Sequence, residues 1–143
     1  MTGAMTDMLD RAAYDRYLTA FNARDYDAVA DFYVDPPHME FFGIVITSRA
    51  ELKQFYSWLH SLVIESVAVR AFAASATCTA IDADVRIEAL RDVSRAELDA
   101  HGATGFFPIR AGEVQVIRQF IFYTTRNGRI ERVECALPPP AQD

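Results

Sequence analysis

The hydrophobic residues of this chain follow a helical spacing in its first third and a strand spacing in the remainder. Tyr14, Tyr17, Leu18 and Phe21 recur at i, i+3, i+4 and i+7, which is typical of a helix with one buried face. Between residues 81 and 89, apolar residues alternate with Asp, Arg and Glu, as in a strand with one buried face. Helices followed by strands predict an α+β fold rather than alternating βαβ units.

Capping residues place two further helices. Asp25 can cap a short second helix, which ends at Asp35-Pro36-Pro37 because proline disfavours the helical conformation of the residue before it. Ser48 and Glu51 form a capping-box pattern that opens a third helix. The apolar stripe of the second helix is Val29, Phe32 and Tyr33, and that of the third is Leu52, Phe55, Tyr56, Leu59 and Val63.

Most of the chain after the third helix predicts strands. The strand segments are 38–42, 67–73, 77–93, 112–125 and 130–136. Asn127-Gly128 is a strong hairpin signal between the last two, and a helical turn is expected within 94–105. We expect a curved, mostly antiparallel sheet that wraps around the helices and leaves an apolar funnel between them.

The 143 residues predict a single domain that is large enough to bury a core. No internal repeat, low-complexity tract or linker divides the chain, so we place this domain at 1–137. The Pro-rich residues 138–143 are expected to form an extended tail.

Composition and charge exclude several classes of protein. Hydrophobic residues make up 51% of the chain and its net charge is −6, which argues against disorder and against binding nucleic acid. No apolar run approaches the roughly 20 residues of a membrane span, and residues 1–10 lack the pattern of a secretory signal. Cys78 and Cys135 are expected to be buried thiols. We expect a cytoplasmic protein that acts on a small molecule.

The sequence offers little support for metal, nucleotide or nucleophilic chemistry. His38, His60 and His101 are too scattered to match the spacing of metal ligands. No G-x-S-x-G elbow, G-x-G-x-x-G motif or P-loop occurs. We therefore expect neither a metal nor a cofactor.

Acid–base chemistry remains. Glu40 stands between Met39 and Phe41, where burial would raise the pKa of its carboxyl and make it a useful base. Tyr17, in the first helical stripe, can donate a hydrogen bond to an oxygen that gains negative charge. The alternatives are that Glu40 is an exposed charge at a strand edge and that Tyr17 is a core residue with a satisfied hydroxyl.

Arg118 interrupts an apolar face of a long strand and either supplies charge in the cavity or pairs with a neighbouring acid. Arg86 and Glu88 are most simply a solvated strand face. If Glu40 faces solvent, the remaining polar candidates are His60, Arg118 and Glu88.

Residues 16–33, Phe42-Gly43, 48–56 and the later stretch from Gly105-Phe-Phe-Pro108 to Asn127-Gly-Arg-Ile130 together resemble the NTF2-like superfamily. Within it, the chain is similar to the SnoaL-like polyketide cyclases and the ketosteroid isomerases. The resemblance covers nearly the whole chain and implies an NTF2-like (cystatin-like) α+β cone, with three N-terminal helices packed in the curved sheet.

The resemblance also suggests roles for individual residues. Tyr17 matches the oxyanion-binding tyrosine of the isomerases, and Glu40 matches the position of their general base. The acid that both groups place on the long strand is absent, since Phe120 or Ile121 stands there. Arg86-x-Glu88 is faintly similar to the Arg-x-Asp of limonene epoxide hydrolases, with Glu131 or Glu134 as the second acid.

We therefore predict a cofactor-independent isomerase, lyase (dehydratase) or cyclase that acts on a hydrophobic cyclic or aromatic molecule. The alternatives are a non-catalytic binding domain and, ranked lower, an epoxide hydrolase-like enzyme. The predicted catalytic residues are Glu40, Tyr17 and His38, and the predicted substrate-binding residues are Arg118, Phe21, Phe42, Phe55, Leu59, His60 and Phe120.

A homodimer is also expected. Ile117, Ile121 and Tyr123 are predicted to lie on the outer face of the sheet, where a second copy would cover them. No nucleic acid or membrane partner is expected.

Overall fold

Each of the three predicted helices begins at a side chain that caps it. The computed structural model describes residues 8–139, and residues 1–7 and 140–143 lie outside the described part. Asp10 accepts a hydrogen bond from the Ala13 N–H at the start of α2, and Asp25 accepts one from Ala28 at the start of α3. Ser48 accepts one from Glu51 at the start of α4. The helices are α2 (Arg11–Asn22), α3 (Tyr26–Asp31), α4 (Arg49–Leu62) and α5 (Arg95–Ala100).

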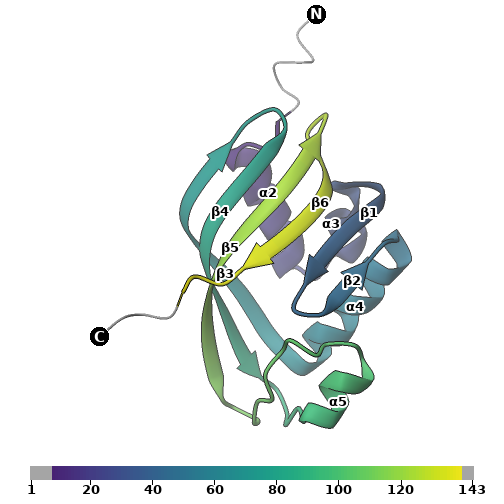
Figure 1. The fold of residues 1–143 in the computed structure, drawn as a ribbon, viewed down its shortest axis with the longest axis vertical. Helices are drawn as coiled ribbons and strands as arrows, with labels where there is room; N and C mark the ends of the chain where they lie inside the picture. The colour runs from purple at the N-terminus through teal and green to yellow at the C-terminus, as the bar shows by residue number, and fades with distance from the viewer. Residues whose placement is uncertain (1–7, 140–143) are drawn as a thin grey trace, which may run out of the picture.

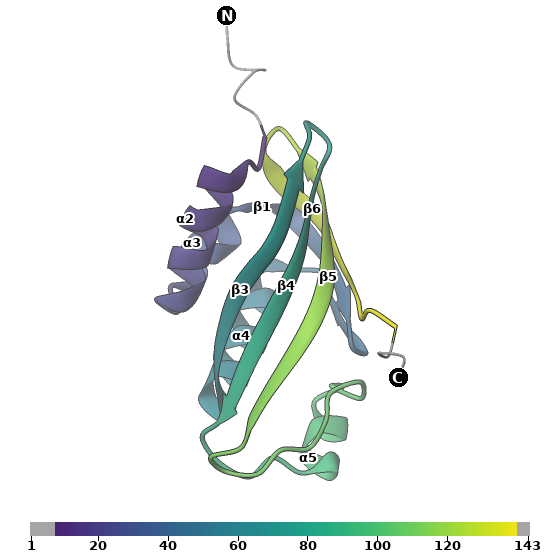
Figure 2. The same ribbon diagram turned by 90° about the vertical axis from the view of Figure 1, so that its left-hand side faces the viewer.

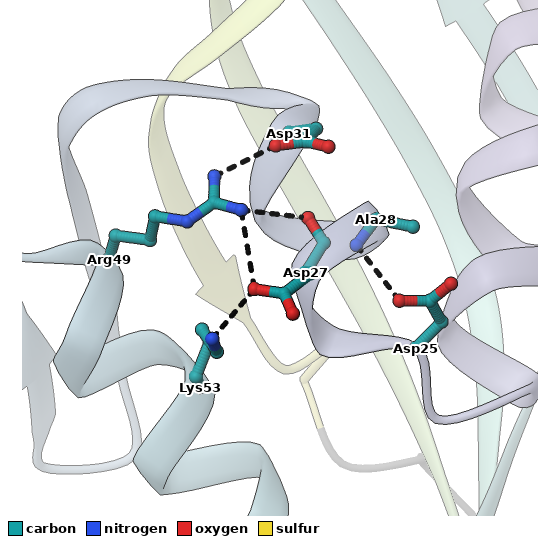
Figure 3. A network of polar contacts seen from close by, with 6 residues as sticks. All are labelled: Asp25, Asp27, Ala28, Asp31, Arg49 and Lys53. Atoms are coloured by element: carbon teal, nitrogen blue, oxygen red, sulfur yellow. Dashed lines mark hydrogen bonds and ion pairs between the residues drawn. The ribbon is translucent and has the colours of Figure 1, made fainter.

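Helices α3 and α4 are joined by ion pairs on their exposed sides (Figure 3). Arg49 donates to Asp31 at 2.9 Å, and Lys53 donates to Asp27 at 2.6 Å. The hydrogen bond from Lys53 lowers the pKa of Asp27. Together with the Asp25 cap, these contacts fix how the short α3 lies against α4.

The strands form one six-stranded sheet in the order β2-β1-β6-β5-β4-β3 (Figure 1). Every neighbouring pair is antiparallel except β1 and β6, which are parallel. The mostly antiparallel α+β prediction is therefore confirmed. The strands are β1 (Tyr33–Phe41), β2 (Ile44–Ile46), β3 (Val63–Ala74), β4 (Cys78–Ala89), β5 (Val114–Arg126) and β6 (Arg129–Ala136).

Several strand boundaries differ from the prediction, and two of them bear on the site. Strand β1 begins at Tyr33 rather than at His38, because Pro36 and Pro37 fall where the pairing with β6 shifts register and no ladder donor is needed. Val63 starts β3 instead of ending α4, with φ −140° and ψ 155°. The hairpin at Asn127-Gly128 is confirmed, and both residues have positive φ.

Helices α2, α3 and α4 lie on one face of the curved sheet, and no described helix packs along the length of the other face (Figure 2). Helices α2 and α4 pack against β3, while α3 and α4 pack against β1. The segment that contains α5 closes the lower end of the sheet in Figure 2. None of the helices between residues 8 and 139 has the length and apolarity needed to cross a membrane.

The facing of β5 corrects one prediction. Ile117, Ile121 and Tyr123 point toward the helices, and Tyr123 is only 4% exposed. The outer face of β5 instead carries an apolar stripe of Val114, Val116, Phe120 and Phe122. Because β5 is apolar at both odd and even positions, its alternation does not reveal from sequence which set faces the core.

The terminal predictions lie only partly within the described residues. Residues 137–139 follow β6 without regular secondary structure, and the rest of the predicted tail lies outside. The segment expected to lack a secretory signal also lies mostly outside.

Candidate active site

A cavity of about 120 Å³ lies between the inner face of the sheet and the helices. Apolar side chains from β3, β4 and β5, among them Val67, Val85 and Ile117, form its sheet side. Phe21 of α2 and Leu59 of α4 form part of its helix side. The predicted apolar funnel is therefore present.

Glu65 is the one charged residue among the described residues that line this cavity. It lies on β3 between Val63 and Val67, and strand alternation directs all three inward. Its side chain is 14% exposed. Across the sheet it pairs with Ile87 of β4, which in turn pairs with Gln115 of β5, so these three lining residues form one row.

His60 holds the Glu65 carboxylate from behind the cavity. Its Nε2 lies 2.9 Å from Glu65 Oε1, and its Nδ1 lies 2.9 Å from the Tyr26 hydroxyl. Nε2 donates to the Glu65 carboxylate, which can only accept, and the Tyr26 hydroxyl contacts the other ring nitrogen. The second carboxylate oxygen, Oε2, has no hydrogen-bond partner among residues 8–139 and remains available to a ligand.

Five tyrosines line the cavity, and four of them form hydrogen-bonded pairs. The hydroxyls of Tyr14 and Tyr123 lie 2.9 Å apart, and those of Tyr17 and Tyr33 lie 2.7 Å apart. The fifth hydroxyl, that of Tyr56, has no partner among the described hydrogen bonds. Its position leaves it free to donate to a ligand.

Burial keeps these phenols protonated. It raises the pKa of Tyr14 to about 12, and it raises the pKa values of Tyr17, Tyr33, Tyr56 and Tyr123 well above their ordinary value. The Glu65 charge adds to the pKa increase of Tyr17 and of Tyr56, which line the same cavity. The tyrosines therefore act as hydrogen-bond donors at neutral pH, not as bases.

Cys135 also lines the cavity, and burial raises the pKa of its thiol to about 12. Only the thiolate is a strong nucleophile. Cys135 is therefore a neutral wall residue at physiological pH.

The cavity mouth depends on a close contact between two loops. The Gly105 N–H donates to the Phe42 carbonyl at 2.8 Å, and a Cβ on Gly105 would lie 2.7 Å from the Phe42 backbone. Only glycine fits this approach. The contact places the Phe42 and Phe106 rings 5.4 Å apart at the cavity wall.

Comparisons with known proteins identify the fold. A candidate polyketide cyclase from Silicibacter sp. TM1040 superposes with a TM-score of 0.72 at 18% identity, over 97% of this chain and 91% of that one. A SnoaL-like polyketide cyclase from Agrobacterium tumefaciens str. C58 gives 0.67 at 14% identity, over 88% of each chain. An NTF2-like protein of unknown function from Burkholderia pseudomallei K96243 gives 0.66 at 14% identity, over 96% and 92%. The chain has the NTF2-like fold.

No protein-family model matches the chain, and no curated protein matches it in sequence. One fold can carry several unrelated activities, so the residues of the site, and not the fold, indicate the function.

Glu40 and His38 lie outside the cavity of this NTF2-like fold. The Glu40 side chain is 54% exposed, and it lies 3.3 Å from Arg132 and 3.4 Å from His38. Met39 and Phe41, its immediate neighbours, point into the cavity, so strand alternation turns Glu40 outward. The expectation that Glu40 faces Tyr17 inside the funnel is wrong, and the exposed-charge alternative describes it.

Arg118 and Phe120 also face outward. Arg118 makes two hydrogen bonds to Asp82, at 2.9 and 2.7 Å, which is the structural pairing considered from sequence. Phe120 is 40% exposed. The prediction that these two residues bind substrate inside the cavity is therefore wrong in its geometry.

The other predicted residues lie in or beside the cavity. Tyr17, Phe21, Phe42 and Leu59 line it. Phe55 is buried next to it and packs against Phe41 at a ring distance of 5.5 Å, while His60 stands behind Glu65.

The epoxide hydrolase-like pair lies elsewhere. Arg86 and Glu88 contact each other on the outer face, and Glu131 and Glu134 pair with Arg126 and Arg132. None of these four residues lines the cavity. Within residues 8–139, no three His, Cys, Asp or Glu side chains gather as a metal-binding group.

Proposed function

We propose that this protein is a cofactor-independent acid/base enzyme that moves a proton on a hydrophobic cyclic or aromatic small molecule. The reaction class is isomerisation, elimination or cyclisation. The observation that carries the proposal is a single carboxylate, Glu65, in an otherwise uncharged cavity. The Glu65 side chain is only 14% exposed, and a positioned carboxylate is a common general base.

Glu65 takes the proton in this proposal, and His60 positions the Glu65 carboxylate. The hydrogen bond from His60 Nε2 fixes Oε1, which leaves Oε2 to face the substrate. Tyr26 holds the other ring nitrogen and so sets the tautomer. His60 is a positioning residue, because it does not line the cavity.

Tyrosine hydroxyls supply the second half of the chemistry. Proton removal leaves negative charge on the substrate, and neutral donors in a dry cavity stabilise such charge. Tyr17, which is paired with Tyr33, and Tyr56 line the same cavity as Glu65 and are the donors in this proposal.

A nitro-substituted benzisoxazole tests the proposal. This apolar aromatic probe loses a ring proton to a base as its N–O bond breaks, and the product is a coloured cyanophenolate. We expect Glu65→Gln to lower the catalysed rate by about 10²–10⁴-fold, because shape is kept and basicity is lost. Glu40→Gln is the matched control, since it makes the same change on the outer face. Equal rates for the wild type and Glu65→Gln would contradict the proposal.

A non-catalytic small-molecule-binding domain is the second candidate. It is favoured by the pairing of four tyrosine hydroxyls with each other, which suits a structural role. The same assay separates the two, because a binding domain would retain the probe without accelerating its elimination.

A further inference from the structure

We propose that the cavity selects apolar amines in their positively charged form, with Glu65 as the counter-ion and a neighbouring aromatic wall as the second recognition element. The inference names a substrate class for the proposed function. It rests on that function in one respect, because both place the substrate in this cavity. It requires binding there but no turnover.

The charges in and around the cavity favour a cationic ligand. Glu65 is 14% exposed, and no Lys, Arg or His is among the described residues that line the cavity. A carboxylate removed from water is costly unless an opposite charge compensates it. His60 supplies one hydrogen bond. The nearby Arg24 guanidinium donates to the His60 carbonyl from the exposed side and does not line the cavity. His60 contacts only Oε1, so a cationic ligand would place positive charge beside Oε2, which has no partner among residues 8–139.

The cavity wall beside Glu65 is aromatic. The Phe21 ring lies 6.3 Å from Tyr17 and 5.1 Å from Tyr56, so the three form a continuous aromatic surface. His60, which contacts Glu65, lies 5.1 Å from Phe21 and 5.7 Å from Tyr56. The carboxylate and the rings thus meet at one place. Aromatic faces attract ammonium groups, most strongly where water is excluded.

Other ligand charges fit this cavity less well. A carboxylate, phosphate or sulfate would meet Glu65 with no cation to offset either charge. A neutral hydrocarbon would leave Glu65 Oε2 without a partner among residues 8–139. The apolar side chains Val67, Val85 and Ile117 can cover the hydrocarbon part of an amine. A cationic nitrogen next to the reacting carbon also makes its C–H bond more acidic, which assists proton transfer to Glu65.

Three ligands of similar shape test the inference by isothermal titration calorimetry. They are benzyltrimethylammonium, its neutral carbon analogue neopentylbenzene and the anion phenylacetate. The quaternary cation cannot lose its charge. We expect it to bind the wild type about tenfold or more tightly than the neutral analogue, with phenylacetate weakest. This comparison needs no variant.

Glu65→Gln and Glu40→Gln then locate the effect. We expect Glu65→Gln to remove the preference for the cation while neopentylbenzene binds as before, and Glu40→Gln to preserve the preference. Equal binding of the cation and the neutral analogue, a preference that survives in a folded Glu65→Gln protein, or binding of none of the three would each overturn the inference. Loss of turnover alone would overturn only the proposed enzymatic activity, because calorimetry here measures binding.

Discussion

The five tyrosines that line the cavity make the folded state sensitive to alkaline pH. Burial raises the pKa of Tyr14 from 10.0 to about 12. Between these pH values the unfolded chain loses the Tyr14 proton and the folded protein keeps it. The contribution of Tyr14 to the free energy of unfolding is therefore fully present below pH 10 and is lost as the pH rises toward 12. The shift of Tyr14 alone corresponds to a loss of about 3 kcal/mol in the free energy of unfolding across this pH range. The other four shift in the same direction.

Urea titrations across this pH range, with phenolate absorbance recorded, check the prediction. Tyr14→Phe should lower the stability at pH 7, because the Tyr123 hydroxyl loses its partner, and should make the decline above pH 10 less steep. A flat stability between pH 10 and 12 would contradict the burial of these phenols.

Tyr17 offers a second test at the residue scale. Its hydroxyl is 2.7 Å from that of Tyr33, and the residue lines the same cavity as Glu65. If the pair stabilises charge on the reacting molecule, Tyr17→Phe should lower kcat for the benzisoxazole probe by about 10²-fold and leave KM nearly unchanged. An effect confined to KM would instead assign Tyr17 to binding.

Glu40 and Glu65 show what the sequence could and could not reveal about the site. Glu40 has apolar neighbours at i±1, and in a strand those neighbours point to the opposite face, so their burial turns Glu40 outward. Glu65 has valines at i±2, which share its face and bring it inward. The sequence carries this signal as Val63-x-Glu65-x-Val67, but Val63 also continues the apolar spacing of the third helix, which hides the strand alternation.

At the scale of elements, the cap of α4 controls much of the site, because this helix carries Tyr56, Leu59 and His60. Ser48 accepts a hydrogen bond from the Glu51 N–H, and Glu51 accepts one from Thr47. We expect Ser48→Ala to lower the free energy of unfolding by about 1 kcal/mol. Ser57→Ala in the exposed middle of α4 is the control and should change it little. Urea denaturation measures both, and equal effects would show that the cap does not matter.

Local chemistry predicted the elements better than it predicted their facing. Asp25, Ser48 and Asn127-Gly128 are caps and a turn whose geometry involves only a few neighbouring residues, and all three occur as predicted. Which side of a strand faces the core is decided by contacts between residues that are far apart in the sequence. Ile117 and Phe120 are both apolar, and only packing against α2 and α4 determines which of them enters the cavity.

At the scale of the whole molecule, the sheet has one face covered by helices and a second face along whose length no described helix packs. The second face carries the apolar stripe of β5, in which Val116 is 60% and Phe122 is 44% exposed. Arg118, which pairs with Asp82, lies within the stripe between Val116 and Phe120. Exposed apolar side chains gathered on one strand favour an interface, and an isologous interface needs a patch that can pair with itself.

We predict that this stripe pairs with its copy in a homodimer. This keeps the expectation drawn from the sequence and replaces Ile117, Ile121 and Tyr123 with the residues that face outward. Sedimentation at micromolar concentration should show a species of twice 16.0 kDa. Val116→Glu should dissociate it, because two carboxylates would be buried across the symmetry axis. Leu90→Glu adds the same charge at a residue 52% exposed outside the stripe and should leave the dimer intact. A wild type that sediments only as a monomer would remove the dimer, and equal dissociation by both variants would move the interface away from β5.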